Sequence, residues 1–292
     1  MNPVGSRTVA VIGGNGQLGT DVVAAFAAQG WNAAALTHED IRVDDAASVN
    51  AVIGALKPAV VVNTAAFHVP AQCETEPDRA FAVNATGALN VARSANDAGA
   101  ACVYVSTDYV FDGAKRAPYL ETDQPNPLNT YGASKLAGER AVMDNAERAL
   151  VIRVSGLYGA VPCRAKGSNF VTTMVRAAAE RAEVRVVTDE ILTPTPTPVV
   201  AAALVDLVTV EARGLFHLTC EGECSWHDFA RAIFDEMKIT TPLVPVTSDA
   251  FPVGVARPDY SVLDNAALRA LGRPALPPWR TALTEFVRNT RR

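Results

Sequence analysis

A short strand followed at once by a glycine-rich turn limits the folds that this chain can adopt. The run from Thr8 to Ile12 leads into Gly13-Gly14-Asn15-Gly16-Gln17-Leu18-Gly19, and an Ala-rich helical segment continues to residue 29. Glycines at this spacing allow a tight turn whose backbone N–H groups can meet an anion at the start of the helix. The arrangement is typical of a parallel α/β sheet that binds the pyrophosphate of a dinucleotide. The expected cofactor contacts are Gly13, Gly16, Gln17, Leu18 and Gly19.

The alternation of strand and helix continues through the first half of the chain. Further strands are predicted over residues 32–36, 59–63, 102–106 and 149–154, with helices over 46–55, 77–98 and 129–145 between them. This order predicts an α/β fold with a Rossmann-type doubly wound parallel sheet. Residues 1–155 would form the dinucleotide-binding domain, with strands near 184–187 and 214–218 returning to its sheet. Residues 156–292 would mainly form a smaller, mixed α/β substrate-binding domain.

Composition narrows the kind of partner. The chain has 292 residues and a formal net charge of −5, so it offers no basic excess for binding a nucleic-acid backbone. It has no block of Lys or Arg suited to an anionic membrane surface, and no apolar run approaches the ~20 residues of a membrane span. The apolar run near the start is too short for a signal-peptide core. We therefore expect a small-molecule partner, with neither nucleic acid nor membrane.

The cysteines favour a cytoplasmic protein without a metal site. They are odd in number and lack the paired Cys-x-x-Cys spacing of a zinc site; they are Cys73, Cys102, Cys163, Cys220 and Cys224. We expect all of them to be reduced thiols.

Residues after the second and third strands are candidates for cofactor contacts. At the first of these places an acidic residue would bind the ribose hydroxyls of NAD, whereas an arginine would pair with the 2′-phosphate of NADP. Thr37 leaves room for that phosphate and His38 could contact it, although neither has the fixed fork of an arginine. NADP(H) is therefore favoured over NAD(H). After the third strand, Asn63, Ala65 and Ala66 would lie against the cofactor.

A tyrosine and a lysine four residues apart suggest an acid–base pair. Tyr131 and Lys135 fall on one face of the helix predicted over 129–145, about one turn apart. Tyrosine normally titrates at about pH 10, and a nearby positive charge favours its phenolate. Taken alone, this spacing more often marks a buried ring beside a solvated amine. The acid–base interpretation of Tyr131 and Lys135 becomes stronger because Ser106 and Thr107 end a strand upstream, after a dinucleotide-binding turn.

These segments together resemble a known family. The similarity is to the extended short-chain dehydrogenase/reductases, and most closely to the dTDP-4-dehydrorhamnose reductase family. It is carried by the glycine turn, Asn63 to Ala66, Ser106 to Gly113, Pro127 to Glu139, Arg257-Pro258 and Ser261 to Asp264. The resemblance implies NAD(P)H-dependent reduction of the 4-keto group of a nucleotide-linked deoxysugar, and it makes a homodimer a reasonable expectation.

The resemblance also implies roles for individual residues. Thr107 would hydrogen-bond the substrate carbonyl, Tyr131 would protonate its oxygen, and Lys135 would hold the nicotinamide ribose and lower the pKa of the tyrosine. Ser106 would join the cofactor contacts. The expected substrate contacts are Thr107, Asp108, Arg164, Lys166, Asn169 and Arg257. Arg164 and Lys166 could clamp a diphosphate or could belong to a solvated loop.

Three departures from related enzymes bear on the reaction and the substrate. Asp108 is followed by Tyr109 where sugar-nucleotide dehydratases have a glutamate, which favours plain keto reduction and leaves Asp108 either structural or at the pocket edge. Pro70 to Glu74 replaces the reductases' Val-Asp-Lys-Ala-Glu, and Gly156 replaces a tryptophan that packs on the sugar. Losing that ring is expected to enlarge the site.

Two alternatives to the reductase stay open. One is a non-catalytic, dinucleotide-binding subunit like the regulatory subunit of methionine adenosyltransferase. The other is a nucleotide-sugar epimerase, which would retain NAD through catalysis.

Overall fold

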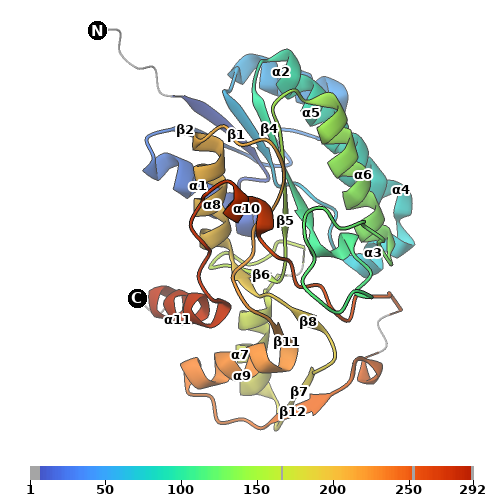
Figure 1. The fold of residues 1–292 in the computed structure, drawn as a ribbon, viewed down its shortest axis with the longest axis vertical. Helices are drawn as coiled ribbons and strands as arrows, with labels where there is room; N and C mark the ends of the chain where they lie inside the picture. Colours follow the sequence, from blue (N-terminus) through green and yellow to red (C-terminus); the bar gives the residue numbers. More distant parts are fainter. Residues whose placement is uncertain (1–6, 166, 252–253, 291–292) are drawn as a thin grey trace.

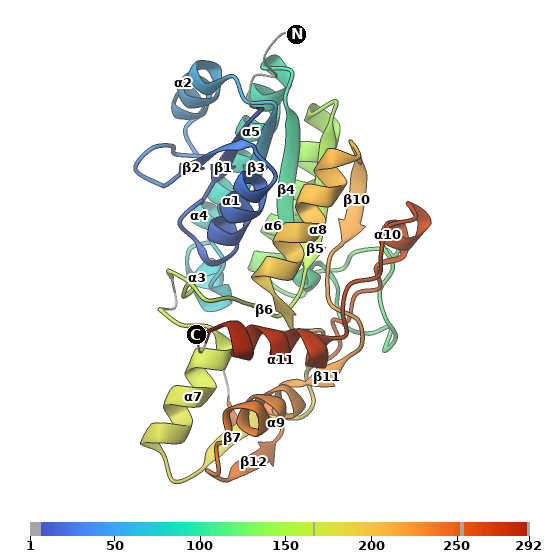
Figure 2. The same ribbon diagram turned by 90° about the vertical axis from the view of Figure 1, so that its left-hand side faces the viewer.

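A six-stranded parallel sheet forms the centre of the molecule. The computed structural model describes residues 7–165, 167–251 and 254–290. The strands follow the order β10-β5-β4-β3-β1-β2 (Figures 1 and 2). They are β1 (Thr8–Ile12), β2 (Asn32–Leu36), β3 (Val60–Asn63), β4 (Ala101–Thr107), β5 (Ala149–Val154) and β10 (Gly214–His217). Every pairing in this sheet is parallel, and β2 and β3 flank β1 on opposite sides. Ligands bind at such a switch point in doubly wound sheets, and the predicted fold class is confirmed.

Alternating side chains along the strands bury both faces of the sheet. Val9 and Val11 of β1 pack in one hydrophobic cluster with α1 (Gln17–Ala28) and α8 (Thr197–Thr209). Ala10 and Ile12 belong to a second cluster on the other face. That face is covered by α2 (Ala46–Leu56), α5 (Gly87–Asp97) and α6 (Thr130–Asn145), as Figures 1 and 2 show.

The helix predicted over residues 77–98 contains a wider turn. It consists of α4 (Pro77–Phe81), a π-helical segment η1 (Ala82–Thr86) and α5. The side chain of Asn84, in that segment, is fully buried. It accepts a 2.9 Å hydrogen bond from Phe67 N and donates to Phe67 O and Ser134 Oγ, both at 2.9 Å. The π turn thus lets a buried amide join the loop after β3 to α6.

A smaller lobe lies below the sheet in Figure 2. Its β7 (Val184–Val187) pairs with β12 (Leu243–Val246), so the prediction that residues 184–187 return to the main sheet is wrong. The reason lies in the pattern of β7, because Val184 and Val186 are buried while Arg185 is exposed. A strand inside a parallel sheet is buried on both faces. The prediction for residues 214–218 is confirmed by β10.

The lobe has its own hydrophobic core. Buried residues of α7 (Phe170–Glu180), α9 (Trp226–Met237) and α11 (Trp279–Thr290) form one cluster with β7. Ser225 caps α9 through a capping box with Asp228, as its position in the sequence suggests. The short connections are α3 (Pro70–Thr75), η2 (Asp108–Val110), β6 (Leu157–Tyr158), β8 (Ile191–Leu192), β9 (Thr195–Pro196), β11 (Cys224–Ser225), η3 (Ser248–Ala250) and α10 (Ala266–Ala270).

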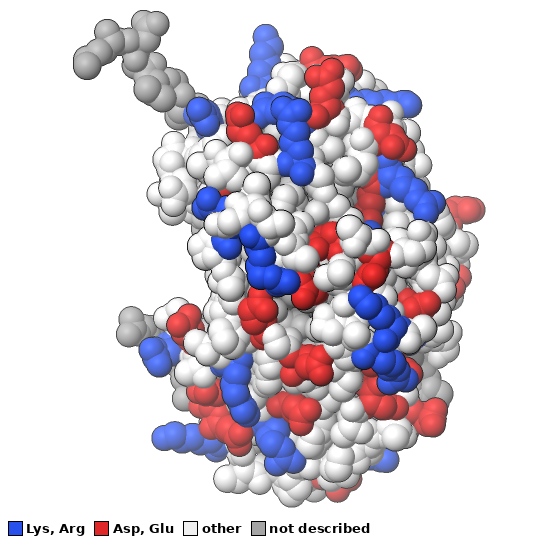
Figure 3. Space-filling view, viewed as in Figure 1, with Lys and Arg blue, Asp and Glu red and all other residues white. Residues whose placement is uncertain are grey.

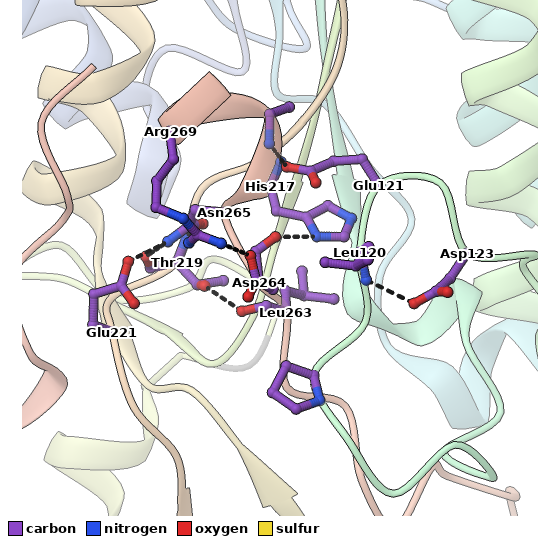
Figure 4. Close-up of polar contacts among 12 residues, drawn as sticks. Leu120, Glu121, Asp123, His217, Thr219, Glu221, Leu263, Asp264, Asn265 and Arg269 are labelled. Atoms are coloured by element: carbon purple, nitrogen blue, oxygen red, sulfur yellow. Dashed lines mark hydrogen bonds and ion pairs between the residues drawn. The ribbon is translucent and has the colours of Figure 1, made fainter. Parts of the chain in front are cut away.

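Buried polar contacts fasten the C-terminal segment to the end of β10 (Figure 4). The side chain of Asn265 donates to Thr219 O at 2.8 Å and to Glu221 Oε1 at 3.1 Å, and accepts from Thr219 N at 3.1 Å. Glu121 Oε1 accepts from the backbone N–H groups of His217 and Ala267, each at 3.1 Å. Residues 121, 217–221 and 264–269, which are distant in sequence, are thereby held together.

Replacing Asn265 by alanine should destabilise the fold. Asn265 is buried, and its loss leaves the backbone N–H and C=O of Thr219 without their side-chain partner. We expect the free energy of unfolding to fall by about 2–3 kcal/mol, measured by urea denaturation. Asn126→Ala is the matched control, because Asn126 is exposed and donates to Asp112; it should change stability by less than about 0.5 kcal/mol. Equal losses in both variants would contradict a special role for Asn265.

The surface carries charges of both signs. On the face shown in Figure 3, basic and acidic side chains are interspersed rather than gathered into areas of one sign. Within residues 7–165, 167–251 and 254–290, no helix has both the length and the apolar character needed to cross a membrane.

Candidate active site

The glycine turn brings α1 close to the strands that precede and follow it. Gly13 has φ +77°, a conformation that side chains rarely adopt. A Cβ on Gly19 would lie 2.1 Å from Gly13 O, and one on Gly14 would lie 2.7 Å from Ala35 Cα. Gly16 precedes the first turn of α1 without a side-chain cap. The turn therefore leaves a helix N-terminus open to an anion.

A cavity of about 1250 Å³ extends from this turn across the carboxyl ends of the strands. Most of the predicted site residues line it, namely Gly13, Gly16, Gln17, Leu18, Gly19, Thr37, His38, Ala65, Ala66, Ser106, Thr107, Asp108, Tyr131, Lys135, Arg164, Asn169 and Arg257. Asn63 does not line the cavity; it is buried, and its Oδ1 accepts from Ala65 N at 3.1 Å. Lys166 lies outside the described residues. The volume is ample for a ligand larger than a typical small molecule.

The end of β2 carries a carboxylate that the sequence reasoning missed. Asp40 Oδ2 accepts hydrogen bonds from Thr37 N at 2.8 Å and Thr37 Oγ1 at 2.7 Å. These two bonds hold the pKa of Asp40 below its ordinary value, so it is charged at neutral pH. The hydroxyl of Thr37 is thus already engaged, while His38 beside it is exposed.

The start of α6 is anchored on three sides, which fixes Tyr131. Asn129 Oδ1 caps the helix by accepting from Gly132 N at 2.8 Å, and Asn129 Nδ2 donates to Ala256 O at 2.9 Å. Glu74 accepts from Thr130 N at 2.7 Å. A Cβ on Gly132 would lie 2.1 Å from Tyr109 O, so this glycine lets α6 approach η2 closely. Glu74 and Gly132 are supporting residues that the sequence reasoning left without a role.

Tyr131 is a half-buried phenol that stays protonated at neutral pH. Burial raises its pKa well above the ordinary value, and a hydrogen bond with Thr107 partly offsets this. Charge on Asp108, Tyr109 and Cys73 raises the pKa further. Its ring meets that of Tyr109 edge to face, with centroids 5.9 Å apart. A phenol of this kind is suited to donating a proton to an oxygen that gains negative charge.

Lys135 lies one turn further along α6, with its ammonium group at the cavity wall. It is almost fully buried and lines the cavity. Burial lowers its pKa to about 7, and the charge of Glu139 acts in the opposite direction. Its Nζ lies 3.9 Å from the centroid of the Tyr104 ring, whose face attracts a cation.

Asp108 links the end of β4 to two other segments. Its Oδ2 accepts from Ser155 Oγ at 2.8 Å and from Ser261 Oγ at 2.6 Å, while its Oδ1 accepts from Thr107 Oγ1 at 3.1 Å. Burial raises the pKa of Asp108, and these three hydroxyls oppose that rise. The two roles left open for Asp108 in the sequence are therefore combined, because it lines the cavity and also holds Thr107 in place.

The lobe side of the cavity supplies a partly paired cation. Arg257 Nη1 lies 4.0 Å from Glu190 Oε2, and Arg257 Nε is buried without a hydrogen-bond partner among the described residues. Trp226 Nε1 donates to Glu190 Oε2 at 3.1 Å. Glu190 and Trp226 also line the cavity and were not predicted. The only hint in the sequence was that Glu190 closely follows a strand.

Asn169 and Gly156 serve the backbone at the cavity wall. Asn169 caps α7 through a capping box, and its Nδ2 donates to Gly159 O at 2.7 Å, so its amide is already occupied. Gly156 has φ +56°, and a Cβ there would lie 2.8 Å from Leu192 Cδ1 and 3.0 Å from Pro194 Cα. A side chain at this position would therefore clash with Leu192 and Pro194, and the expectation that the lost tryptophan enlarges the site stays a prediction.

Comparison with known proteins agrees with this arrangement. Residues 7–292 match the family model described as the RmlD substrate binding domain. The chain is 38% identical over 280 residues to the spore coat polysaccharide biosynthesis protein SpsK of Bacillus subtilis, with 96% of each chain covered. It is 38% identical over 277 residues to a dTDP-4-keto-6-deoxy-D-glucose reductase of Streptomyces niveus, with 94% of each covered.

A solved structure extends the match to the whole fold. The structure of dTDP-4-dehydrorhamnose reductase from Bacillus anthracis, in complex with NADP, matches with a TM-score of 0.94 and 34% identity. The match covers 98% of this chain and 100% of that one. The chain therefore belongs to the RmlD substrate-binding-domain family, the family of the dTDP-4-dehydrorhamnose reductases.

Proposed function

We propose that this protein is an NAD(P)H-dependent reductase acting on the 4-keto group of a nucleotide-linked 6-deoxysugar. The observation that carries the proposal is the meeting of Thr107, Tyr131 and Lys135 on the wall of one cavity that also reaches the glycine turn. Family relatives named as reductases of dTDP-linked keto sugars support it. In this proposal residues 1–155 mainly bind the cofactor and residues 156–292 mainly bind the substrate.

The cavity fits a dinucleotide. The cradle of Gly13, Gly16 and Gly19 would receive the pyrophosphate at the N-terminus of α1, since side chains there would fill the space. Lys135, which lines the cavity, would hold the nicotinamide ribose. The bound NAD(P)H would supply the hydride.

The side chains of this chain would handle the proton. The substrate carbonyl would lie against the hydroxyls of Thr107 and Tyr131, which are hydrogen-bonded to each other. Because burial keeps Tyr131 protonated, its phenol can give the proton to the developing alkoxide. The cation at Lys135 would then stabilise the phenolate that remains. The absence of a glutamate after Asp108 leaves no group at that position for the elimination of water.

Two cavity residues bear on the choice of cofactor and substrate. Thr37 leaves room for a 2′-phosphate, and we propose NADP(H) as the favoured cofactor, in keeping with the NADP complex of the relative from Bacillus anthracis. Asp40 is the charge that would oppose this preference. On the lobe side, Arg257 lines the cavity with a side chain that is one-third exposed, and its guanidinium would bind the diphosphate.

The decisive experiment is a reductase assay on purified protein. Oxidation of NADPH or NADH is followed by the loss of the near-ultraviolet absorbance of the reduced nicotinamide. The substrates are dTDP-4-keto-6-deoxyglucose, its 3,5-epimerised product and a UDP-linked 4-keto sugar. We expect turnover of a dTDP-linked sugar, with a higher kcat/KM for NADPH. Failure to oxidise either cofactor with any of these sugars would refute the proposed activity.

The same assay separates the two alternatives. A regulatory subunit would bind cofactor without turnover, whereas an epimerase would interconvert sugars with no net oxidation of the cofactor. The resemblance also predicts a homodimer, which light scattering of the eluted protein would test.

A further inference from the structure

The ammonium group of Lys135 is buried with few partners of its own. It makes no hydrogen bond to any residue in the described part of the chain, and its Nζ lies over the π face of the Tyr104 ring. Burying a cation in such a place is costly unless an anion lies nearby. The charge that acts on it is that of Glu139, one turn further along α6.

Glu139 is held in a fixed position behind the cavity wall. It is 5% exposed and does not line the cavity. Arg153 of β5 binds it with both nitrogens of its fork, with Nε 2.8 Å from Oε1 and Nη2 2.6 Å from Oε2. The hydroxyl of Ser106, at the end of β4, donates to the same Oε1. One carboxylate therefore contacts the two central strands next to α6.

The other titratable groups around Lys135 do not compete for this role. On β4, the pKa of Tyr104 is raised far above its ordinary value by burial, and its hydroxyl donates to Asn84 O at 2.7 Å. On β10, His217 lies 3.5 Å from Arg153, and burial and that charge lower its pKa to about 3, so it is neutral. Tyr131, on α6 itself, is protonated. The charged groups left on the Glu139 side of Lys135 are Glu139 and Arg153, which form an ion pair.

We propose that Glu139 is a positioning residue that keeps Lys135 cationic and ties the strand end bearing Thr107 to the helix bearing Tyr131. Ser106 directly precedes Thr107, so its bond to Glu139 fixes the placement of Thr107 relative to α6. Arg153 prevents the carboxylate from swinging into the cavity by holding both of its oxygens. The inference rests on the roles proposed above for Thr107, Tyr131 and Lys135.

The test follows the charge of Lys135 directly. The chain has only five lysines, at 57, 115, 135, 166 and 238, so the Cε signals of protein labelled with 13C at that carbon can be assigned with a Lys135→Met variant. In the cofactor-free wild type we expect one signal to titrate at about 7. Glu139→Gln should move this titration to lower pH by about one unit, because an attractive charge is lost.

Three further variants guard against a trivial result. Glu139→Asp keeps the charge and should restore a titration close to that of the wild type, whereas Asp144→Asn removes an exposed carboxylate of the same helix and should move nothing. Glu139→Gln leaves Arg153 without its partner, so the double variant Glu139→Gln/Arg153→Met removes both charges in case the single one does not fold. It should move the titration downward by less than Glu139→Gln alone, because the repulsion between Arg153 and Lys135 is removed as well. An unmoved Lys135 titration in folded Glu139→Gln protein, or in the double variant where only that one folds, overturns the inference.

Activity then separates this inference from the proposed function. The proposed reaction needs the Lys135 ammonium, so kcat/KM should fall as pH rises. At a pH above the Lys135 pKa of both the wild type and Glu139→Gln, the variant should retain about one tenth of the wild-type kcat/KM if its pKa is lower by one unit. The loss should shrink at low pH, which a merely structural defect would not produce. If the Lys135 titration moves while the wild type and variant share one pH profile, the catalytic role of Lys135 fails and the electrostatic role of Glu139 stands.

Discussion

Replacing Tyr131 by phenylalanine should reduce kcat by about 10³-fold while leaving the protein folded. The substitution removes the phenol proton and keeps the ring that meets Tyr109 edge to face. Only a hydrogen bond with Thr107 is lost, so the free energy of unfolding should change by about 1 kcal/mol. Stopped-flow and steady-state assays with NADPH measure the rate, and urea denaturation measures stability.

Tyr109→Phe is the matched control for this variant. Tyr109 is a second half-buried phenol on the same cavity wall, and desolvation and Asp108 raise its pKa as well. It should lose less than about tenfold in kcat, because Tyr131 still supplies the proton. The opposite result, with Tyr109→Phe inactive and Tyr131→Phe active, would show that Tyr109 and not Tyr131 donates the proton. Cofactor affinity measured by fluorescence should be close to that of the wild type in both variants.

The central sheet and the catalytic helix were predictable because local patterns specify them. The strands β1, β2 and β5 have the bounds predicted from the sequence, and β1 and β5 are rich in β-branched residues. The turn from Gly13 to Gly19 requires glycine, because a Cβ on Gly19 would collide with the backbone of Gly13. The spacing of Tyr131 and Lys135 requires only a continuous helix, which α6 provides.

The smaller lobe was less predictable because its contacts join distant segments. The pairing of β7 with β12 depends on residues about sixty positions apart, and a four-residue strand carries little signal of its partner. The π turn in η1 arises because Asn84 reaches Phe67 and Ser134, which the helix pattern does not reveal. The conformation of Gly156 depends on the segment from Leu192 to Pro194.

The supporting residues of the site show the same limit. Glu74, Glu139 and Arg153 look in the sequence like ordinary charges of helices and strands. They gain a role only when the fold buries Glu139 against Arg153 and places Glu74 at the start of α6. Catalytic residues that lie close together in the sequence, such as Tyr131 and Lys135, can be predicted from their spacing. The charged residues that affect their pKa values are brought near them only by tertiary packing.

Replacing Gly19 by alanine should weaken cofactor binding by about 100-fold or more. A Cβ at this position would lie 2.1 Å from Gly13 O and 2.8 Å from Gly13 C, and both atoms belong to the backbone of the turn. Neither can rotate away as a side chain would, so the turn must open and its N–H groups must leave the anion site. The free energy of unfolding should also fall by about 1–3 kcal/mol. Isothermal titration with NADP⁺ and NAD⁺ measures the affinity.

Gly54→Ala is the control that separates this steric effect from a general effect of alanine. Gly54 lies on the exposed side of α2, with nothing within 4 Å of an added Cβ. Alanine there should stabilise the helix by about 0.5–1 kcal/mol and leave the Kd of both dinucleotides unchanged. Unaltered affinity in a folded Gly19→Ala protein would show that the cofactor does not use this turn. Because α1 would then have no anion to bind, the assignment of the whole cavity to a dinucleotide would fail with it.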